Sequence, residues 1–124
     1  LKKGAKKIFS VDTDTLAVNA TKDNAILNNI DLDRLEVSLG SIDNLELQLK
    51  GRKVDILLCN ILANVIEKMA PNFSKVIAPN GSALLSGLLV AQVKKLEKIL
   101  NSLGWGVVNF YEKEGWVLIN ISRF

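Results

Sequence analysis

The sequence of 124 residues contains no histidine, one cysteine and two prolines. Without histidine, no imidazole is available as a base or a metal ligand near neutral pH. One cysteine cannot form a disulfide within the chain, and a zinc site built from it and scattered acids is not expected. Cys59 lies inside an apolar stretch with no histidine to activate it, so we predict that it serves packing rather than nucleophilic catalysis. We predict no metal site.

The chain also lacks long apolar runs and a strong excess of either charge. Its composition, 48% hydrophobic and 23% charged, is that of a globular domain. The net charge is only +3, and the basic run at 2–7 is more typical of solvated surface than of a nucleic-acid interface. The longest apolar stretch, 56–66, is interrupted by Asn60 and Asn64 and is too short to span a membrane. No apolar segment of a signal peptide follows the basic start. We expect a soluble cytoplasmic protein without membrane or direct nucleic-acid partners, and nothing indicates its oligomeric state.

Strand-like and helix-like stretches alternate along the chain, which predicts an α/β domain with helices on the faces of a mostly parallel sheet. The nearly continuous apolar run Val54–Cys59 is typical of a central strand covered on both faces. Leu35–Leu39 alternates apolar and polar residues, which predicts an edge strand with one wet face. Two further strands are expected at 7–12 and 82–87.

Two helices are expected between these strands. Asp14 is a suitable N-cap for the first, because its carboxylate can accept hydrogen bonds from the free amides of the first turn. Asn28 and Asn29 tolerate the left-handed conformation that ends a helix. A second helix is expected over 61–76, interrupted near Pro71, and the residues 79–81 have the chemistry of a turn. The apolar stripe predicted for the first helix consists of Leu16, Ala17, Ala20, Ile26, Leu27 and Ile30.

The C-terminal third indicates the fold class. Gly104 is placed to terminate a third helix, and the segments 107–112 and 116–122 are β-rich and separated by only a few residues. Parallel neighbours need a crossover of about a dozen residues or more, so this pair must form an antiparallel hairpin. An α/β chain that ends in a helix and a reversed strand resembles the Rossmann-like methyltransferase fold. The stripe of the third helix consists of Leu89, Val93, Leu96, Leu100 and Leu103.

Two polar residues follow strands at positions where α/β sheets bind ligands. Asp12 ends the first strand and could accept the ribose hydroxyls of an adenosine, although it could equally help to cap the following helix. Asn60 ends the Val54 strand, and its amide could hold an amine or the amino-acid part of a cofactor. Taken alone, Asn60 is more simply explained as an N-cap. We expect both residues on the same rim of one sheet.

Three other residues invite a functional interpretation. Gly87 closes a strand after Ser86, where either a close backbone approach or a plain turn would require glycine. Trp105 and Trp116 flank the hairpin region, and packing in the core or at its rim explains them better than a stacking platform.

Taken in order, several short motifs resemble the ribosomal protein L11 methyltransferase family, and the resemblance runs the whole length of the chain. The tetrapeptide that begins at Asn60 is its most specific element, whereas the Asp12-Thr13-Asp14 element is shared with many other methyltransferases. The motifs are Gly4-Ala5-Lys6-Lys7, Val11-Asp12-Thr13-Asp14, Asn60-Ile61-Leu62-Ala63, Ser86-Gly87-Leu88-Leu89 and Glu112-Lys113-Glu114-Gly115-Trp116-Val117.

The resemblance implies an S-adenosylmethionine-dependent protein N-methyltransferase that modifies lysine and α-amino nitrogens of a large-subunit ribosomal protein. Asp12 matches the acid that binds the cofactor ribose. Asn60 matches the asparagine that closes the cofactor and substrate pocket, which makes it both the catalytic candidate and a cofactor-binding one. Where many methyltransferases carry an acid for adenine, Ser41 follows Gly40, and Asp43 is a weak substitute. The reaction implied is attack of a neutral amine on the sulfonium methyl, in which the enzyme mainly provides alignment.

The resemblance also implies that residues 1–124 are a partial catalytic domain, lacking the first strand and the Gly-rich loop. That strand would lie between the Ile8 and Val54 strands, which should therefore either flank a gap or pair directly. Unpaired buried backbone groups cost about 1–3 kcal/mol each, against a total stability of about 5–15 kcal/mol. We expect these residues alone to be aggregation-prone and to bind the cofactor weakly.

Other interpretations remain open at this point. The chain could belong to another class I methyltransferase with a small-molecule or nucleic-acid substrate, or be a non-catalytic remnant. The Asn60 tetrapeptide argues against enzymes that modify planar nitrogens, which use Asn/Asp-Pro-Pro followed by an aromatic residue. The C-terminal hairpin argues against a nicotinamide-dependent dehydrogenase.

Overall fold

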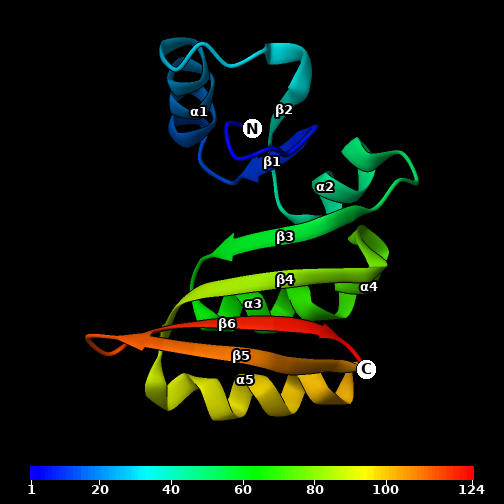
Figure 1. The fold of residues 1–124 in the computed structure, drawn as a ribbon, viewed down its shortest axis with the longest axis vertical. Helices are drawn as coiled ribbons and strands as arrows, with labels where there is room; N and C mark the ends of the chain where they lie inside the picture. The colour runs from blue at the N-terminus through cyan, green and yellow to red at the C-terminus, as the bar shows by residue number, and fades with distance from the viewer. The chain divides into compact units, whose positions relative to one another are not determined.

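The computed structural model describes all residues from Leu1 to Phe124, and they form two compact units. The first unit comprises Leu1–Arg52 and the second Lys53–Phe124. The six strands form two sheets, one of two strands in the first unit and one of four strands in the second (Figure 1). The Ile8 and Val54 strands therefore belong to different sheets. Direct pairing of the Ile8 and Val54 strands, one of the two alternatives expected, is not found.

The first unit contains a parallel strand pair and two helices. Its elements are β1 (Ile8–Asp12), α1 (Thr15–Leu27), a 3-10 helix (Leu32–Arg34), β2 (Leu35–Leu39) and α2 (Ile42–Leu49). β1 and β2 pair in parallel from Ile8 opposite Leu35 to Asp12 opposite Leu39. β2 pairs only with β1, which confirms it as an edge strand. Both strands therefore end together, which brings Asp12 beside the loop that follows β2.

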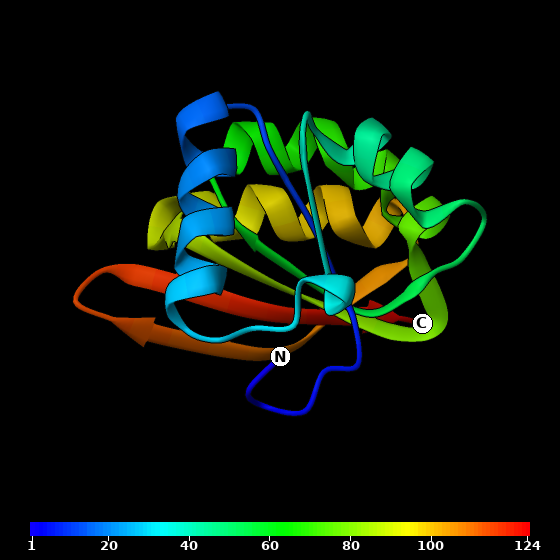
Figure 2. The same ribbon diagram turned by 90° about the horizontal axis from the view of Figure 1, so that it is seen from above.

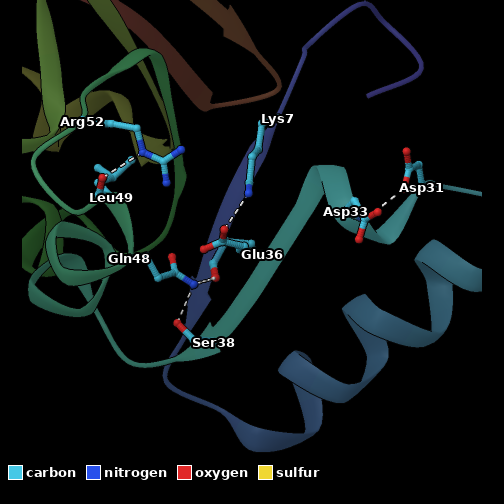
Figure 3. A network of polar contacts seen from close by, with 9 residues as sticks. Lys7, Asp31, Asp33, Glu36, Ser38, Gln48, Leu49 and Arg52 are labelled. Atoms are coloured by element: carbon cyan, nitrogen blue, oxygen red, sulfur yellow. Dashed lines mark hydrogen bonds and ion pairs between the residues drawn. The ribbon is translucent and has the colours of Figure 1, made fainter.

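Polar contacts hold the strands of the first unit to their surroundings (Figure 3). The Lys7 ammonium lies 2.6 Å from the Glu36 carboxylate across the strand pair, and it holds the pKa of that carboxyl below its ordinary value. The Gln48 side chain on α2 donates to the Ser38 hydroxyl on β2 at 2.7 Å. Arg34 donates to the backbone carbonyl of Lys6 at 2.9 Å, which anchors the segment leading into β1.

Helix α1 begins and ends as predicted but buries a different face. The Asp14 carboxylate accepts from the backbone N–H of Leu16 at 2.8 Å, which confirms the N-cap. Asn29 has a φ of 53° just beyond the helix, which confirms the left-handed stop. The predicted apolar stripe is wrong, because Val18 and Ala25 are the buried residues of the helix. The members of the stripe that remain well exposed are Leu16, Ala20, Ile26 and Leu27.

The second unit is a four-stranded mixed sheet with the order β3-β4-β6-β5. β3 and β4 are parallel, whereas β6 runs antiparallel to both β4 and β5. The α/β class and the C-terminal antiparallel hairpin are thereby confirmed. The helices α3 and α5 lie on the same face of this sheet (Figure 2). The elements are β3 (Val54–Asn60), α3 (Ala63–Met69), a 3-10 helix (Ala70–Asn72), α4 (Phe73–Val76), β4 (Ile77–Leu89), α5 (Val90–Ser102), β5 (Trp105–Lys113) and β6 (Trp116–Arg123).

The core of the second unit lies between this sheet and its helices. Val93, Leu96 and Leu100 of α5 are buried, which confirms the middle of the predicted stripe, whereas Leu89 and Leu103 at its ends are exposed. Gly104 follows α5 with a φ of 86°, as a helix-terminating glycine should. The other core positions include Ile66, Phe73, Leu85, Trp105, Ile119 and Ile121.

Two expectations for this unit are wrong. β3 was predicted to be covered on both faces, but Ile56 and Leu58 are 58% and 72% exposed. It is the edge strand of its sheet, as the expected loss of a partner on one side implies. Only its other face, with Leu57 and Cys59, packs against the helices. The segment 79–81 is not a separate turn but lies within β4, where the register with β3 becomes irregular. The turn-forming residues are thus accommodated as an irregularity of a longer strand.

The interrupted helix over 61–76 is confirmed, because α3, a 3-10 helix containing Pro71 and α4 follow one another there.

No helix of the structure has the length and apolar character that a membrane span requires.

Candidate functional site

Asp12 lies at the carboxyl end of β1, and its side chain is exposed. One carboxylate oxygen accepts from the backbone N–H of Asp14 at 2.9 Å, which shapes the turn into α1. The helix itself is capped by Asp14, and Asp12 supports this start of the helix through one of its two carboxylate oxygens. Its second carboxylate oxygen takes no part in this turn and faces an exposed environment, where it can accept hydrogen bonds from a ligand.

The loop after β2 lies directly beside Asp12. The backbone N–H of Gly40 donates to the Asp12 carbonyl at 2.8 Å. Gly40 has a φ of 141°, and a Cβ there would lie 2.1 Å from the Asn44 side chain. The Asn44 amide oxygen accepts from the Ser41 N–H at 3.2 Å at the start of α2, where Asp43 lies exposed in the first turn. Within the first unit, the fold therefore brings together Asp12, Gly40 and Ser41. An adenine contact by Asp43, the weak substitute for the acid that Ser41 replaces, stays a prediction.

Asn60 is the last residue of β3, and its side chain is exposed. The simpler explanation, that Asn60 caps the following helix, is wrong: α3 begins at Ala63, and its N-cap position is Leu62, without a side-chain hydrogen bond. The Asn60 amide is therefore not engaged by the helix that follows it. Asn60 pairs with Ser86 of β4, so it lies at the rim where β3 and its pairing with β4 end.

Gly87 contacts the Asn60 side chain directly. It has a φ of 75°, and a Cβ built on it would lie 2.6 Å from the Asn60 amide oxygen. Of the two explanations that the sequence allowed for this glycine, close approach is therefore the one confirmed. Within the second unit, the fold brings together Asn60, Ser86 and Gly87.

Cys59 and Trp105 belong to the core, as predicted. Burial raises the pKa of the Cys59 thiol to about 11, so the thiolate that a nucleophile requires does not form near neutral pH. Trp105 is 1% exposed and meets Phe73 edge to face at 6.2 Å, and the Arg123 guanidinium lies 5.0 Å from its ring. Trp116, at the start of β6, is exposed instead.

A cavity of about 360 Å³ opens in the first unit, but it does not contain the candidate residues. Its walls come from α1, β1, β2 and the first residues of the chain, and they are mainly apolar. It therefore offers none of the chemistry expected of Asp12 or Asn60. Its lining includes Leu1, Ile8, Thr21, Asn24, Ala25 and Leu35.

The packing of Asn44 over Gly40 was not predicted. A glycine before a Ser41 N-cap, followed three residues later by a side-chain amide, is the local signal that could have indicated it. We predicted that Asp12 and Asn60 line one pocket. This stays a prediction, because the two residues belong to different units.

Comparison with known proteins decides the family. Residues 1–123 match the model of the family described as ribosomal protein L11 methyltransferase (PrmA). The chain belongs to the ribosomal protein L11 methyltransferase family. A relative of that name from Parasynechococcus marenigrum is 52% identical over 97% of this chain, and one from Prochlorococcus marinus (strain MIT 9313) is 48% identical over the same share.

Solved structures agree with this family membership. The crystal structure of a ribosomal protein L11 methylase from Lactobacillus delbrueckii subsp. bulgaricus matches with a TM-score of 0.86 and 25% identity, over 98% of this chain and 60% of that chain. A putative methyltransferase from Thermoplasma acidophilum matches with a TM-score of 0.76 at 12% identity, covering 94% of this chain and 57% of that chain, which shows the likeness of fold alone. The chain spans 42% and 40% of the two curated family relatives named above.

Proposed function

We propose that this chain contributes the sites of Asp12 and Asn60 to an S-adenosylmethionine-dependent protein N-methyltransferase that modifies lysine and α-amino nitrogens of ribosomal protein L11. The observation that carries the proposal is the exposed Asn60 amide, which lies over Gly87 at the rim of β3 and β4 and does not cap a helix. The family membership and the names of the relatives support the substrate. Such a substrate favours a cytoplasmic location.

The chemistry of the candidate residues fits the proposed cofactor. The exposed Asp12 carboxylate can accept hydrogen bonds from the two hydroxyls of a ribose, since one of its oxygens lies outside the turn with Asp14. Asn60 offers both a donor and an acceptor to an amino-acid group. Bound by these residues, S-adenosylmethionine would supply an electrophilic methyl group on a sulfonium sulfur.

The role proposed for Asn60 is to orient the substrate amine. A free lysine titrates near 10.4, so the amine must first lose a proton, which desolvation favours. The Asn60 amide oxygen can then accept from an N–H of the neutral amine and fix the direction of its lone pair. Alignment of this kind can account for a large part of a rate enhancement. The protein needs no nucleophile of its own, in keeping with the raised pKa of the neighbouring Cys59 thiol.

Replacement of Asn60 tests this proposal in the protein as its gene encodes it. Asn60→Ala should lower kcat/KM for methylation of L11 by about 100-fold, because the amine loses its orienting partner. The free energy of unfolding should change by less than about 1 kcal/mol, because the side chain is exposed and caps no helix. Transfer of a radiolabelled methyl group and urea denaturation measure the two quantities.

Asn101→Ala provides the matched control, since Asn101 is an exposed asparagine on α5. It should leave both quantities near their wild-type values. Turnover by Asn60→Ala close to that of Asn101→Ala would remove Asn60 from the mechanism.

A further inference from the structure

Gly87 occupies a bulge at the carboxyl end of β4. The register between β4 and β6 shifts between Leu85, opposite Ile119, and Leu88, opposite Val117. Ser86 and Gly87 together therefore face a single residue of β6. Bulges of this kind bend a strand and redirect side chains, and they are frequent beside active sites. This one begins at the residue that pairs with Asn60.

The bulge brings the Gly87 backbone against the end of the Asn60 side chain. A Cβ on Gly87 would lie 2.6 Å from the Asn60 amide oxygen, closer than atoms in contact allow, and 3.4 Å from the Ile61 carbonyl oxygen. The Ile61 distance is an ordinary van der Waals contact. The amide oxygen of Asn60 is therefore the one atom that any side chain at position 87 would have to displace.

A comparable packing in the first unit serves a different purpose. The Asn44 amide lies over Gly40 and also accepts from the Ser41 N–H, so a hydrogen bond within the chain fixes its orientation. The Asn60 amide caps no helix. Its oxygen lies against the position that a side chain on Gly87 would occupy.

Another glycine of the second unit has a similar positive φ without such a contact. Gly104 has a φ of 86°, close to the 75° of Gly87, but a Cβ on Gly104 would meet no atom within 4 Å. A positive φ is unfavourable for any residue with a side chain. Gly104 therefore measures the cost of the backbone conformation alone, and Gly87 adds the contact with Asn60.

We propose that Gly87 is a positioning residue for Asn60: because it has no side chain, it leaves room for the Asn60 amide to take the orientation that the substrate amine requires. The inference rests on the proposed function of Asn60. Its first consequence is structural. Because the displaced atom is the end of an exposed, flexible side chain, Gly87→Ala should turn Asn60 away and leave the sheet intact.

The side-chain amide resonance of Asn60 tests this contact without any assay of activity. The experiment uses the protein as its gene encodes it. The ¹H–¹⁵N signal of the Asn60 amide is assigned as the one that disappears in Asn60→Ala. In Gly87→Ala the signal should move well beyond its displacement in Gly104→Ala, which also places a side chain at a positive φ. An unchanged signal in Gly87→Ala would overturn the inference.

A double-mutant cycle tests the effect on catalysis. Gly87→Ala should lower kcat by about 100-fold when Asn60 is present, because a displacement of about 1 Å can cost that much. In the Asn60→Ala background, the same substitution should lower kcat by no more than about threefold, since its target is gone. Equal losses in both backgrounds would overturn the inference, because Gly87 would then act through the fold.

The two measurements separate this inference from the proposed function. Full turnover by Asn60→Ala would refute the catalytic role of Asn60, and with it the role of Gly87 in catalysis. The amide resonance would still show whether Gly87 orients the Asn60 side chain. A shifted resonance together with a strong coupling in the cycle supports the inference.

Discussion

At the residue scale, local chemistry predicted some roles and misjudged others. Asp14 was assigned correctly as an N-cap, because its neighbours in the sequence determine whether a carboxylate meets the free amides of a first turn. Asn60 was assigned a cap as its simplest role, yet α3 begins only at Ala63. Helix starts are uncertain by a residue or two from local pattern alone. The contact between Asn60 and Gly87 joins residues on two different strands. The sequence alone could not predict how close these two residues lie.

The buried thiol of Cys59 makes stability depend on pH. Its pKa is about 11 in the folded protein and 9.0 as the ordinary value, so the unfolded chain loses this proton first as the pH rises. The neutral thiol contributes to the free energy of unfolding. This contribution is fully present below pH 9 and is lost between about pH 9 and pH 11, at roughly 1.4 kcal/mol per pH unit. The free energy of unfolding should fall by roughly 2–3 kcal/mol more in the wild type than in Cys59→Val over this range.

Urea denaturation of both proteins at several pH values under reducing conditions measures this difference. Cys59→Val has no thiol but retains every other group that titrates there, so it is the matched reference. Parallel stability profiles for the two proteins would show that the thiol is not buried as described.

At the element scale, periodicity predicted which elements form better than it predicted what covers them. The spacing of Val93, Leu96 and Leu100 correctly indicated the buried face of α5, because a helix against one sheet buries one stripe. The apolar run of β3 suggested cover on both faces, but Ile56 and Leu58 are exposed. A pattern of apolar residues indicates a preference for burial. It does not identify the element that covers them.

The exposed edge and face of β3 should make the 124-residue polypeptide prone to aggregate. Unpaired apolar edge strands invite pairing with other chains, and a charged side chain on such a strand opposes it. Leu58→Lys should therefore slow aggregation several-fold, as measured by light scattering at constant concentration and salt.

Leu47→Lys is the control, because Leu47 on α2 is 74% exposed and Leu58 is 72% exposed. Both substitutions add the same charge at similar exposure, but only one lies on an edge strand. If the two variants slowed aggregation equally, net charge rather than the β3 edge would be responsible.

At the scale of the whole molecule, the order of strands and helices was enough to predict the fold class. The short connection between β5 and β6 required an antiparallel pair, and that reversed strand distinguished a methyltransferase-like fold from a dehydrogenase. The placement of β6 between β4 and β5 depends on contacts far apart in the sequence. The sequence left open whether the Ile8 and Val54 strands pair directly or flank a gap. The structure places them in separate sheets, with Asp12 in one and Asn60 in the other.

The central claim is that this gene product methylates ribosomal protein L11 through a site that includes Asn60. Mass spectrometry of L11 from cells with the gene intact, deleted, or replaced by the Asn60→Ala form tests it most directly. We predict methylated lysine or α-amino groups on L11 in the first strain and their loss in the other two. An unchanged mass of L11 after deletion of the gene would contradict the claim.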